Sequence, residues 1–378
     1  MSLAWDRVRA WRLSRQHLDQ RVGSERLLEV VRDVCGFHAQ VQSSTELQMW
    51  ARVDRANRED ITEALWEKRE LVRTWCMRGT LHVLSAGDLP LYVAALSQHD
   101  RWWKGAWLRM IGMSEKELRA TLEAIRVSLG ATSITREKLA EKVGEKTGGK
   151  GRDVMLSGWG EMLKPAAFHG YLCSGPPRGQ SVTFVRPDRW LGRWSVPSSD
   201  RAWREIVRRY LRVYGPADRE EFARWWGMQP APAGRVLKAS EDELAAVDIE
   251  GHAAWALAED LPALSKDRHH PPPRLLPAFD AYIAGTRPRQ SLVDARFQNL
   301  VFPQGRMDLS GRLGGRAGRR RVETRAVGPA YRGHREAFHQ AACRGPQGHR
   351  RGGGRPRPFP RRSSLGVVPG PGLRGRLP

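Results

Sequence analysis

The chain has 378 residues, of which 40% are hydrophobic, and its formal net charge is +23. This length suits two or three domains. The sequence has no apolar run approaching the length of a membrane span and no signal-peptide layout at its N-terminus, so we expect a cytoplasmic, nucleoid-associated protein without a membrane segment. The four cysteines are scattered without a CxxC pair, which argues against structural zinc or a disulfide framework.

The positive charge is concentrated at one end of the chain. Residues 306–378 contain 18 arginines, no lysine and three acidic residues, and so carry most of the net charge. Residues 1–305 are only mildly basic. The extreme net charge is therefore not, by itself, evidence that the body of the protein binds nucleic acid.

The N-terminal part of the chain is predicted to be helical. Trp5, Val8 and Trp11 recur at helical spacing, and Ser24 is a candidate N-cap for a second helix with an apolar stripe over residues 27–35. Further helices are expected at 45–53, from Asn57 or Asp60 onward, through most of 88–168 with a short helix at 135–143, through Trp203 and Tyr210, and through Phe222 and Trp226.

Between the second and third of these helices lies the segment 37–43, in which Gln40 and Gln42 flank Val41. If the backbone leaves the helix at Gly36 and becomes extended, the two carboxamides point to one side. Each carboxamide offers an acceptor and two donors, enough to hold a water molecule or to contact the edge of a base. The alternative is that both glutamines are ordinary polar residues near the end of a helix.

Three hairpins are predicted from β-branched and aromatic runs around glycine-containing turns. They are expected at 71–84, at 171–185 around the turn 175–179, and at 244–257 around the turn 250–251. Each hairpin follows a group of helices, and three helix–helix–hairpin units are the layout of tandem winged helix-turn-helix modules. An irregular α+β protein is the alternative.

The predicted fold class is therefore α+β, mainly α, with three tandem winged helix-turn-helix modules at 1–86, 87–196 and 197–261. Residues 262–305 are interpreted as a linker and the start of a β-rich domain, with a strand expected within 274–282. The pair His269-His270 in the linker lacks carboxylate or cysteine companions, so we interpret it as solvated rather than metal-binding.

Residues 306–378 are predicted to be disordered, because arginine, glycine and proline make up more than half of them. One interpretation is an arginine-rich tail that binds nucleic acid. The other is out-of-frame translation of a GC-rich coding sequence from near residue 303, which we favour because the preceding β-rich domain breaks off midway.

Taken together, several motifs resemble those of the AlkZ-type (YcaQ-like) winged-helix DNA glycosylases, in the same order and over about residues 1–304. These motifs are Ala39-Gln40-Val41-Gln42, the segment 71–82, Gly175-Pro176-Pro177-Arg178-Gly179, Phe222-Ala223-Arg224-Trp225-Trp226-Gly227 and Leu276-Pro277-Ala278-Phe279-Asp280. Any one of them alone is weak, but the combination is specific.

The resemblance implies three winged-helix modules around a concave DNA-binding channel, followed by a β-rich domain. It also implies excision of N-alkylated purines, with interstrand-crosslink unhooking by some members. The family's catalytic Gln-apolar-Gln motif corresponds to Gln40 and Gln42 here, and a related branch has Asp at the second position. The family's final strands have no counterpart after about residue 304, so the β-rich domain is predicted to be truncated.

The implied chemistry is physically coherent. An N7-alkylated purine is already cationic, so it can leave without a strong general acid. Two neutral carboxamides can then suffice, with Gln42 positioning the water that attacks C1′ and Gln40 as its partner. No cofactor or metal ion is expected.

Four residues are candidates for DNA contact. Arg73 and Arg78 flank the first hairpin and His82 lies on its second strand, while Arg178 lies at the proline-stiffened turn of the second hairpin. Structural ion pairs are the alternative for the first two, and a core position is the alternative for His82. For Asp280 we favour a capping or turn role over a functional one.

The competing function is a non-catalytic winged-helix regulator of transcription, which would protect a defined DNA sequence. Three modules in one chain, with a glutamine pair in a shared space, favour an enzyme. Its expected partner is double-stranded DNA that carries alkylated purines, bound by a monomer without sequence preference.

Overall fold

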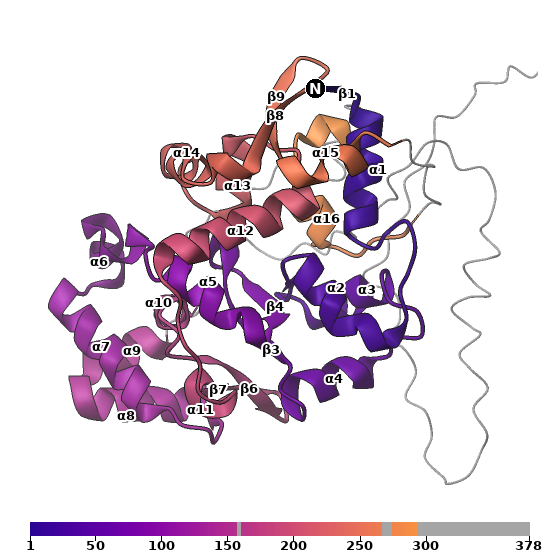
Figure 1. Cartoon of the computed structure of the whole chain (residues 1–378). Helices are drawn as coiled ribbons and strands as arrows, with labels where there is room; N and C mark the ends of the chain where they lie inside the picture. The colour runs from indigo at the N-terminus through magenta and orange to yellow at the C-terminus, as the bar shows by residue number, and fades with distance from the viewer. Residues whose placement is uncertain (157–159, 267–273, 294–295, 297–378) are drawn as a thin grey trace, which may run out of the picture.

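The computed structural model describes residues 1–156, 160–266, 274–293 and 296. Within them the protein is a mainly helical α+β structure (Figure 1). No helix in these ranges combines the length and the apolar character that a membrane crossing needs. The predicted tail, 306–378, and the pair His269-His270 lie outside the described residues.

The helices are α1 (Trp5–Arg15), α2 (Leu27–Asp33), α3 (Gln42–Trp50), α4 (Arg58–Trp66), α5 (Leu89–Leu96), α6 (Gly105–Ile111), α7 (Glu115–Ser128), α8 (Arg136–Thr147), α9 (Gly149–Leu156), α10 (Leu163–Phe168), α11 (Pro187–Trp190), α12 (Ser199–Tyr214), α13 (Arg219–Trp226), α14 (Pro230–Lys238), α15 (Leu261–Leu264) and α16 (Ala281–Gly285). The strands are β1 (Ser2–Leu3), β2 (Phe37–His38), β3 (Leu71–Trp75), β4 (Leu81–Ser85), β5 (Ile134–Thr135), β6 (Cys173–Arg178), β7 (Ser181–Val185), β8 (Leu244–Ile249) and β9 (His252–Leu257).

The first sheet has the order β2-β4-β3, and all its pairings are antiparallel. Helix α2 ends at Asp33, and the chain enters β2 through Gly36, whose φ of +93° is accessible to glycine at little cost. A Cβ at Gly36 would also lie 2.9 Å from the carbonyl oxygen of Val83. The predicted break at Gly36 is therefore confirmed, and it fixes the start of the segment that carries the two glutamines.

The second sheet has the order β5-β7-β6. The hairpin is present, but the prediction of a turn over 175–179 was wrong in its extent. Strand β6 continues through Pro177 to Arg178, with an irregular register between Gly175 and Arg178, and only two residues then connect it to β7. The two prolines are tolerated here because β6 is an edge strand, where a missing N–H disturbs no ladder.

The third sheet contains a strand that was not predicted. The hairpin β8-β9 pairs in register from Leu244 with Leu257 to Ile249 with His252, as expected. The N-terminal residues Ser2–Leu3 add a parallel strand to it. Helix α1 then packs against α12 and α15, so the first 15 residues lie with the third sheet (Figure 1).

Helix α12 links the parts of the core. It crosses the middle of the molecule, with α5 on one side and α13 and α14 on the other (Figure 1). Its Tyr210 is buried against Phe222 and Trp225 of α13. Cysteines 35, 76 and 173 are all buried.

One predicted N-cap and one predicted strand differ from the structure, whereas the helix start predicted at Asn57 is confirmed. Ser24 does not cap a helix, because it begins a short 3-10 turn with Gly23 as N-cap. Asn57 caps α4 in a capping box with Asp60. In the segment 274–282 we expected a strand, but α16 begins there instead, with Asp280 as its N-cap. Residues 274–293 contain no strand, so they provide no support for a β-rich domain.

Candidate active site and DNA-binding surface

The two glutamines lie at the junction between β2 and α3. Gln42 is the first residue of α3, and Val41 is its N-cap with extended backbone angles of φ −120° and ψ 117°. The helix therefore starts three residues earlier than predicted. Gln40, Val41 and Gln42 are all exposed. Val41 is extended, which is what the prediction of two carboxamides on one side requires, and their common direction stays a prediction.

The side chain of Gln42 has a defined orientation. Its Nε2 donates a hydrogen bond to Oε1 of Glu46, one helical turn later, at 3.2 Å. The other carboxylate oxygen of Glu46 pairs with Arg58 at 2.8 Å. Since an ionised carboxylate only accepts, the amide nitrogen of Gln42 must face Glu46, and its carbonyl oxygen is left as an outward acceptor. That is the atom needed to hold a water molecule.

Arg73 supports the backbone of the same segment. Its guanidinium donates to the carbonyl oxygen of Ala39 at 3.1 Å, directly before Gln40. Burial lowers the pKa of Arg73, and it forms no ion pair with any carboxylate in the described part of the chain. The structural ion pair considered for Arg73 is therefore wrong, and its positive charge lies beside the glutamine segment.

His38, His82 and Arg78 form a contiguous group behind the glutamines. His82 is only 2% exposed, and its Nδ1 donates to the carbonyl of Thr80 at 2.9 Å. Its Nε2 is therefore an acceptor, which faces the Arg78 guanidinium at 3.5 Å. Its ring meets His38 edge-on at 5.5 Å.

Both histidines are held neutral. Burial and the nearby Arg78 lower the pKa of His38 to about 4, and burial, Arg78 and His38 lower the pKa of His82 well below its usual value.

A small cavity among His38, His82 and Arg78, also lined by Tyr214 and Trp225, measures about 10 Å³. That is room for about one water molecule and not for a base. His82 is thus an interior residue that could influence DNA only through its neighbours.

Arg78 belongs to a basic cluster that the sequence did not suggest, formed by Arg78, Arg224, Arg287 and Arg289. Arg78 donates to the carbonyl of Trp225 at 2.5 Å, which brings the hairpin against α13. Burial and then Arg289, Arg224 and Arg78 lower the pKa of Arg287 to about 10. Within the described ranges no carboxylate pairs with Arg78, Arg224 or Arg287. This leaves a concentration of positive charge that suits a phosphate backbone.

Arg178 lies elsewhere. It is exposed at the end of β6, and its guanidinium donates to the carbonyl of Ser133 at 2.6 Å. No hydrogen bond or ion pair between described residues connects it to the glutamine segment or to the basic cluster. The structure therefore brings Gln40, Gln42, Arg73, Arg78 and His82 together and leaves Arg178 on a different sheet.

Asp280 has a structural role, as expected. Its carboxylate caps α16 by accepting from the N–H of Tyr282 and is fully buried in an ion pair with Arg52. The residues that sequence reasoning missed are Glu46, Arg224, Arg287 and Arg289. The i,i+4 spacing of Gln42 and Glu46 could have revealed the first. The arginines come from separate segments, so no sequence pattern predicts that they cluster.

One group of side chains could coordinate a metal ion. Ligand atoms of Asp218, Glu221 and His252 lie within 4.8 Å of one another. However, Asp218 and Glu221 already form the capping box of α13, and Arg12 lies 3.9 Å from Glu221. Helix capping and a histidine–aspartate contact of 3.2 Å account for this group, so we assign it no metal.

Comparisons with known proteins identify the family of this chain. The family model described as DNA glycosylase AlkZ-like matches residues 31–344. An interstrand DNA cross-link repair glycosylase of Streptomyces sahachiroi is 33% identical over 299 residues, which cover 78% of this chain and 80% of that protein. The solved structure of the Streptomyces sahachiroi DNA glycosylase AlkZ matches with a TM-score of 0.73 and 31% identity, over 80% of this chain and 82% of that one.

A mainly helical α+β fold with this degree of similarity defines the class of the protein as a DNA glycosylase. The chain belongs to the AlkZ-like DNA glycosylase family. The resemblance inferred from the motifs is thereby confirmed, and the matched region extends beyond residue 304 into the segment predicted to be disordered.

Proposed function

We propose that the protein hydrolyses the N-glycosidic bond of N7-alkylated purines in double-stranded DNA, with Gln40 and Gln42 as its catalytic residues. The observation that carries this proposal is the orientation of Gln42. Its amide nitrogen is held by Glu46 at 3.2 Å, which leaves its carbonyl oxygen facing outward at an exposed site.

The proposed reaction needs only a positioned water and electrostatic stabilisation. The carbonyl oxygen of Gln42 accepts a hydrogen bond from water, and Gln40 orients the same molecule from across Val41. As the bond from C1′ to the base breaks, its electrons neutralise the cationic purine, which departs without a proton. The water oxygen bonds to C1′ and loses a proton to solvent, leaving an abasic site. The carboxamide dipoles and Glu46 stabilise the positive charge that develops on the sugar.

The basic cluster and Arg73 are proposed to hold the DNA backbone over this site. Arg78 contacts His82, His82 contacts His38, and His38 lies two residues before Gln40. These contacts connect the cluster to the glutamine segment through two neutral histidines, and Arg73 adds a positive charge directly beside that segment. Such contacts would give binding without sequence preference and with strong salt dependence. We place Arg178 of the second hairpin at a more distant phosphate.

The three sheets are proposed to be the wings of three winged-helix modules at 1–86, 87–196 and 197–261. Each contains the predicted antiparallel hairpin after a group of helices. Residues 1–15 are the exception, because β1 and α1 pack with the third sheet.

We extend the proposal to the unhooking of interstrand crosslinks. The 33%-identical relative is named an interstrand cross-link repair glycosylase. Because the glutamine segment is exposed and the interior cavity is too small for a base, the reaction takes place at an open surface. An open site can accept an adduct that extends to the opposite strand.

The test uses a duplex with a single N7-methylguanine and a second duplex crosslinked through purine N7 atoms. Alkali cleavage at the abasic product reports excision. We expect lesion-dependent cleavage by the wild type and a loss of at least about a hundredfold in the Gln40→Ala, Gln42→Ala variant. The matched control is Gln20→Ala, Gln98→Ala, which removes two exposed glutamines elsewhere. Full activity of the Gln40→Ala, Gln42→Ala variant would refute the assigned roles.

A further inference from the structure

Phe279 has an unusual backbone and an unusual exposure. Its φ is +63°, in the left-handed region that a bulky L-residue rarely adopts, and the residue is 40% exposed. Exposed apolar residues are common on protein surfaces. An exposed ring on a strained backbone is different, because the surrounding structure must hold it there and such positions cluster at functional sites.

The backbone around Phe279 is fixed on both sides. Before it, the carbonyl of Ala278 accepts a hydrogen bond from the Ser44 hydroxyl. After it, Asp280 is locked by Arg52, and the N–H of Ala281 donates to Oε1 of the buried Gln48 at 3.0 Å. Three residues around the ring, Ala278, Asp280 and Ala281, are thus tied to α3 and to Arg52 just after its C-terminal end. The strain is held in place by the same helix that begins with Gln42.

The ring itself is stacked beside the glutamine segment. It lies parallel to the His38 imidazole, with a centroid distance of 5.1 Å and an interplanar angle of 19°. One face is therefore supported by His38, two residues before Gln40, while the residue as a whole stays exposed to solvent. Because burial and Arg78 keep His38 uncharged, this support is a flat, neutral surface.

We propose that Phe279 stacks on a nucleobase of the bound duplex next to the lesion and so opens the stack for attack by water at Gln42. This inference rests on the proposed function. The aromatic ring of Phe279 can stack on the face of any base, and the surrounding surface is rich in arginine. Such stacking does not depend on sequence and contributes strongly to the binding of unpaired bases. Rigid presentation avoids the entropy cost of ordering the ring upon binding.

The test measures base unstacking separately from excision. The full-length protein is mixed at low salt with a duplex that carries 2-aminopurine next to a non-hydrolysable 2′-fluoro N7-methylguanine, and fluorescence reports the unstacked base. We expect a rise with the wild type, with Phe279→Trp and with the Gln40→Ala, Gln42→Ala variant. We expect Phe279→Ala and Phe279→Gly to abolish the rise and to weaken lesion-duplex binding about tenfold or more.

The matched control is Trp50→Ala, which removes an exposed aromatic ring from the other end of α3; it should behave like the wild type. Thermal melting checks that each variant is folded. If Phe279→Ala is unstable, Phe279→Gly takes its place as the variant without the ring. An unchanged fluorescence rise in both small-residue variants, or no rise with any protein, would overturn the proposal. A Phe279-dependent rise without excision by the wild type would instead sustain it and refute the proposed hydrolysis, so the two ideas fail separately.

Discussion

Arg52 and Asp280 form a two-pronged ion pair, with both nitrogen–oxygen distances at 2.8 Å and both side chains completely buried. The two residues are 228 positions apart in the chain. Arg52 follows α3, and Asp280 caps α16. The pair therefore attaches the segment that carries Phe279 to the helix that starts at Gln42, and it connects the first sheet region with the last described part of the chain.

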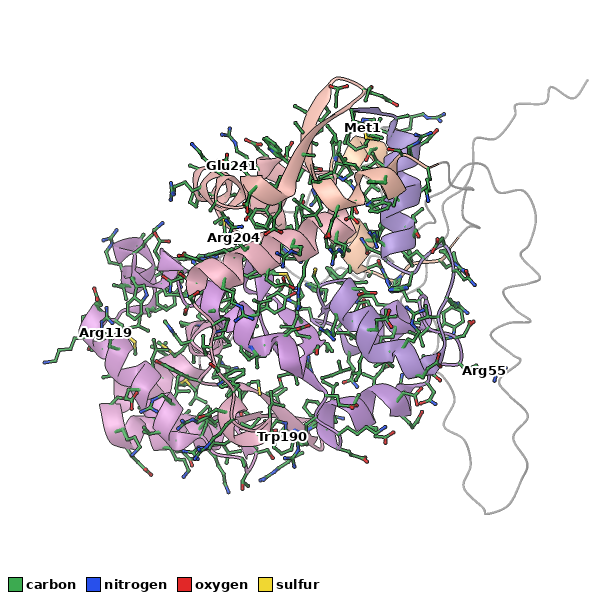
Figure 2. All side chains as sticks on the ribbon, viewed as in Figure 1. Met1, Arg55, Arg119, Trp190, Arg204 and Glu241 are labelled. Atoms are coloured by element: carbon green, nitrogen blue, oxygen red, sulfur yellow. The ribbon has the colours of Figure 1, made fainter. Side chains whose placement is uncertain are left out.

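Asp280→Asn should destabilise the protein strongly, by about 3–5 kcal/mol, because it leaves the Arg52 charge buried without a counterion. Urea unfolding at neutral pH measures the loss. Asp242→Asn is the control, since Asp242 pairs with the exposed Arg204 on the surface of α12 (Figure 2), where solvent screening makes such pairs contribute little. Equal effects of the two substitutions would show that the buried pair is not a structural anchor.

Glu46→Gln should lower the excision rate about tenfold while leaving DNA affinity nearly unchanged. A glutamine at position 46 can present either its oxygen or its nitrogen to Gln42, so the Gln42 carbonyl is no longer held outward. Single-turnover excision and binding to an undamaged duplex provide the two readouts. Glu63→Gln is the control. Glu63 lies on the next helix, α4, and forms an exposed ion pair with Lys68, just after that helix. A parallel loss of rate and affinity would point to a folding defect instead.

Local sequence information predicted the elements well where periodicity and turn residues are decisive. The hairpin from Leu244 to Leu257 was predicted because the two runs on either side of the glycine turn indicate it without tertiary context. The break at Gly36 followed from the same local reasoning and was confirmed by its φ of +93°. The extent of β6 was wrong because two prolines look like a turn, whereas an edge strand tolerates them.

The parts that could not be predicted depend on contacts between distant segments. Strand β1 is only two residues long and exists because β8 offers an open edge. The strand expected near Phe279 was replaced by a helix whose start is fixed by Arg52, a residue with no local signal. The clustering of Arg78 with Arg224 and Arg287 likewise requires the hairpin to contact α13.

The basic cluster makes a prediction about salt dependence. Arg224→Gln and Arg287→Gln should each weaken binding to any duplex and reduce the slope of log affinity against log salt by about one if each contacts one phosphate. Fluorescence anisotropy between low and moderate salt measures the slope. Arg204→Gln is the control, since Arg204 is occupied by Asp242 and Glu243. An unchanged slope in both cluster variants would remove these arginines from the DNA interface.

The buried histidines predict loss of stability at low pH. The pKa of His38 is about 4 in the folded protein and about 6.5 when unfolded. Between these values the unfolded chain binds a proton that the folded chain excludes. Stability present above pH 6.5 is therefore lost as the pH falls to 4, by up to about 3 kcal/mol. His38→Asn should reduce the loss. Urea unfolding at pH 7.5 and 4.5 tests this, and an equal loss in wild type and variant would contradict it.

The strain at Phe279 predicts that glycine is more stable than alanine at this position, which reverses the usual order of the two residues. Both Phe279→Ala and Phe279→Gly lose the ring and its contact with His38, so their difference isolates the backbone. At a φ of +63° glycine avoids the clash that an L-side chain meets, so the glycine variant should be about 1 kcal/mol more stable than the alanine variant.

The reference for this inversion is Ala120→Gly, at an exposed position inside α7. There the same exchange of alanine for glycine should cost about 1 kcal/mol, because helix geometry favours alanine. Melting temperatures of the three variants and the wild type give both differences. Opposite signs at the two positions would establish that Phe279 is held against its backbone preference. The more stable Phe279→Gly protein should nevertheless unstack the base no better than Phe279→Ala, because the strain supports the placement of the ring and not the fold.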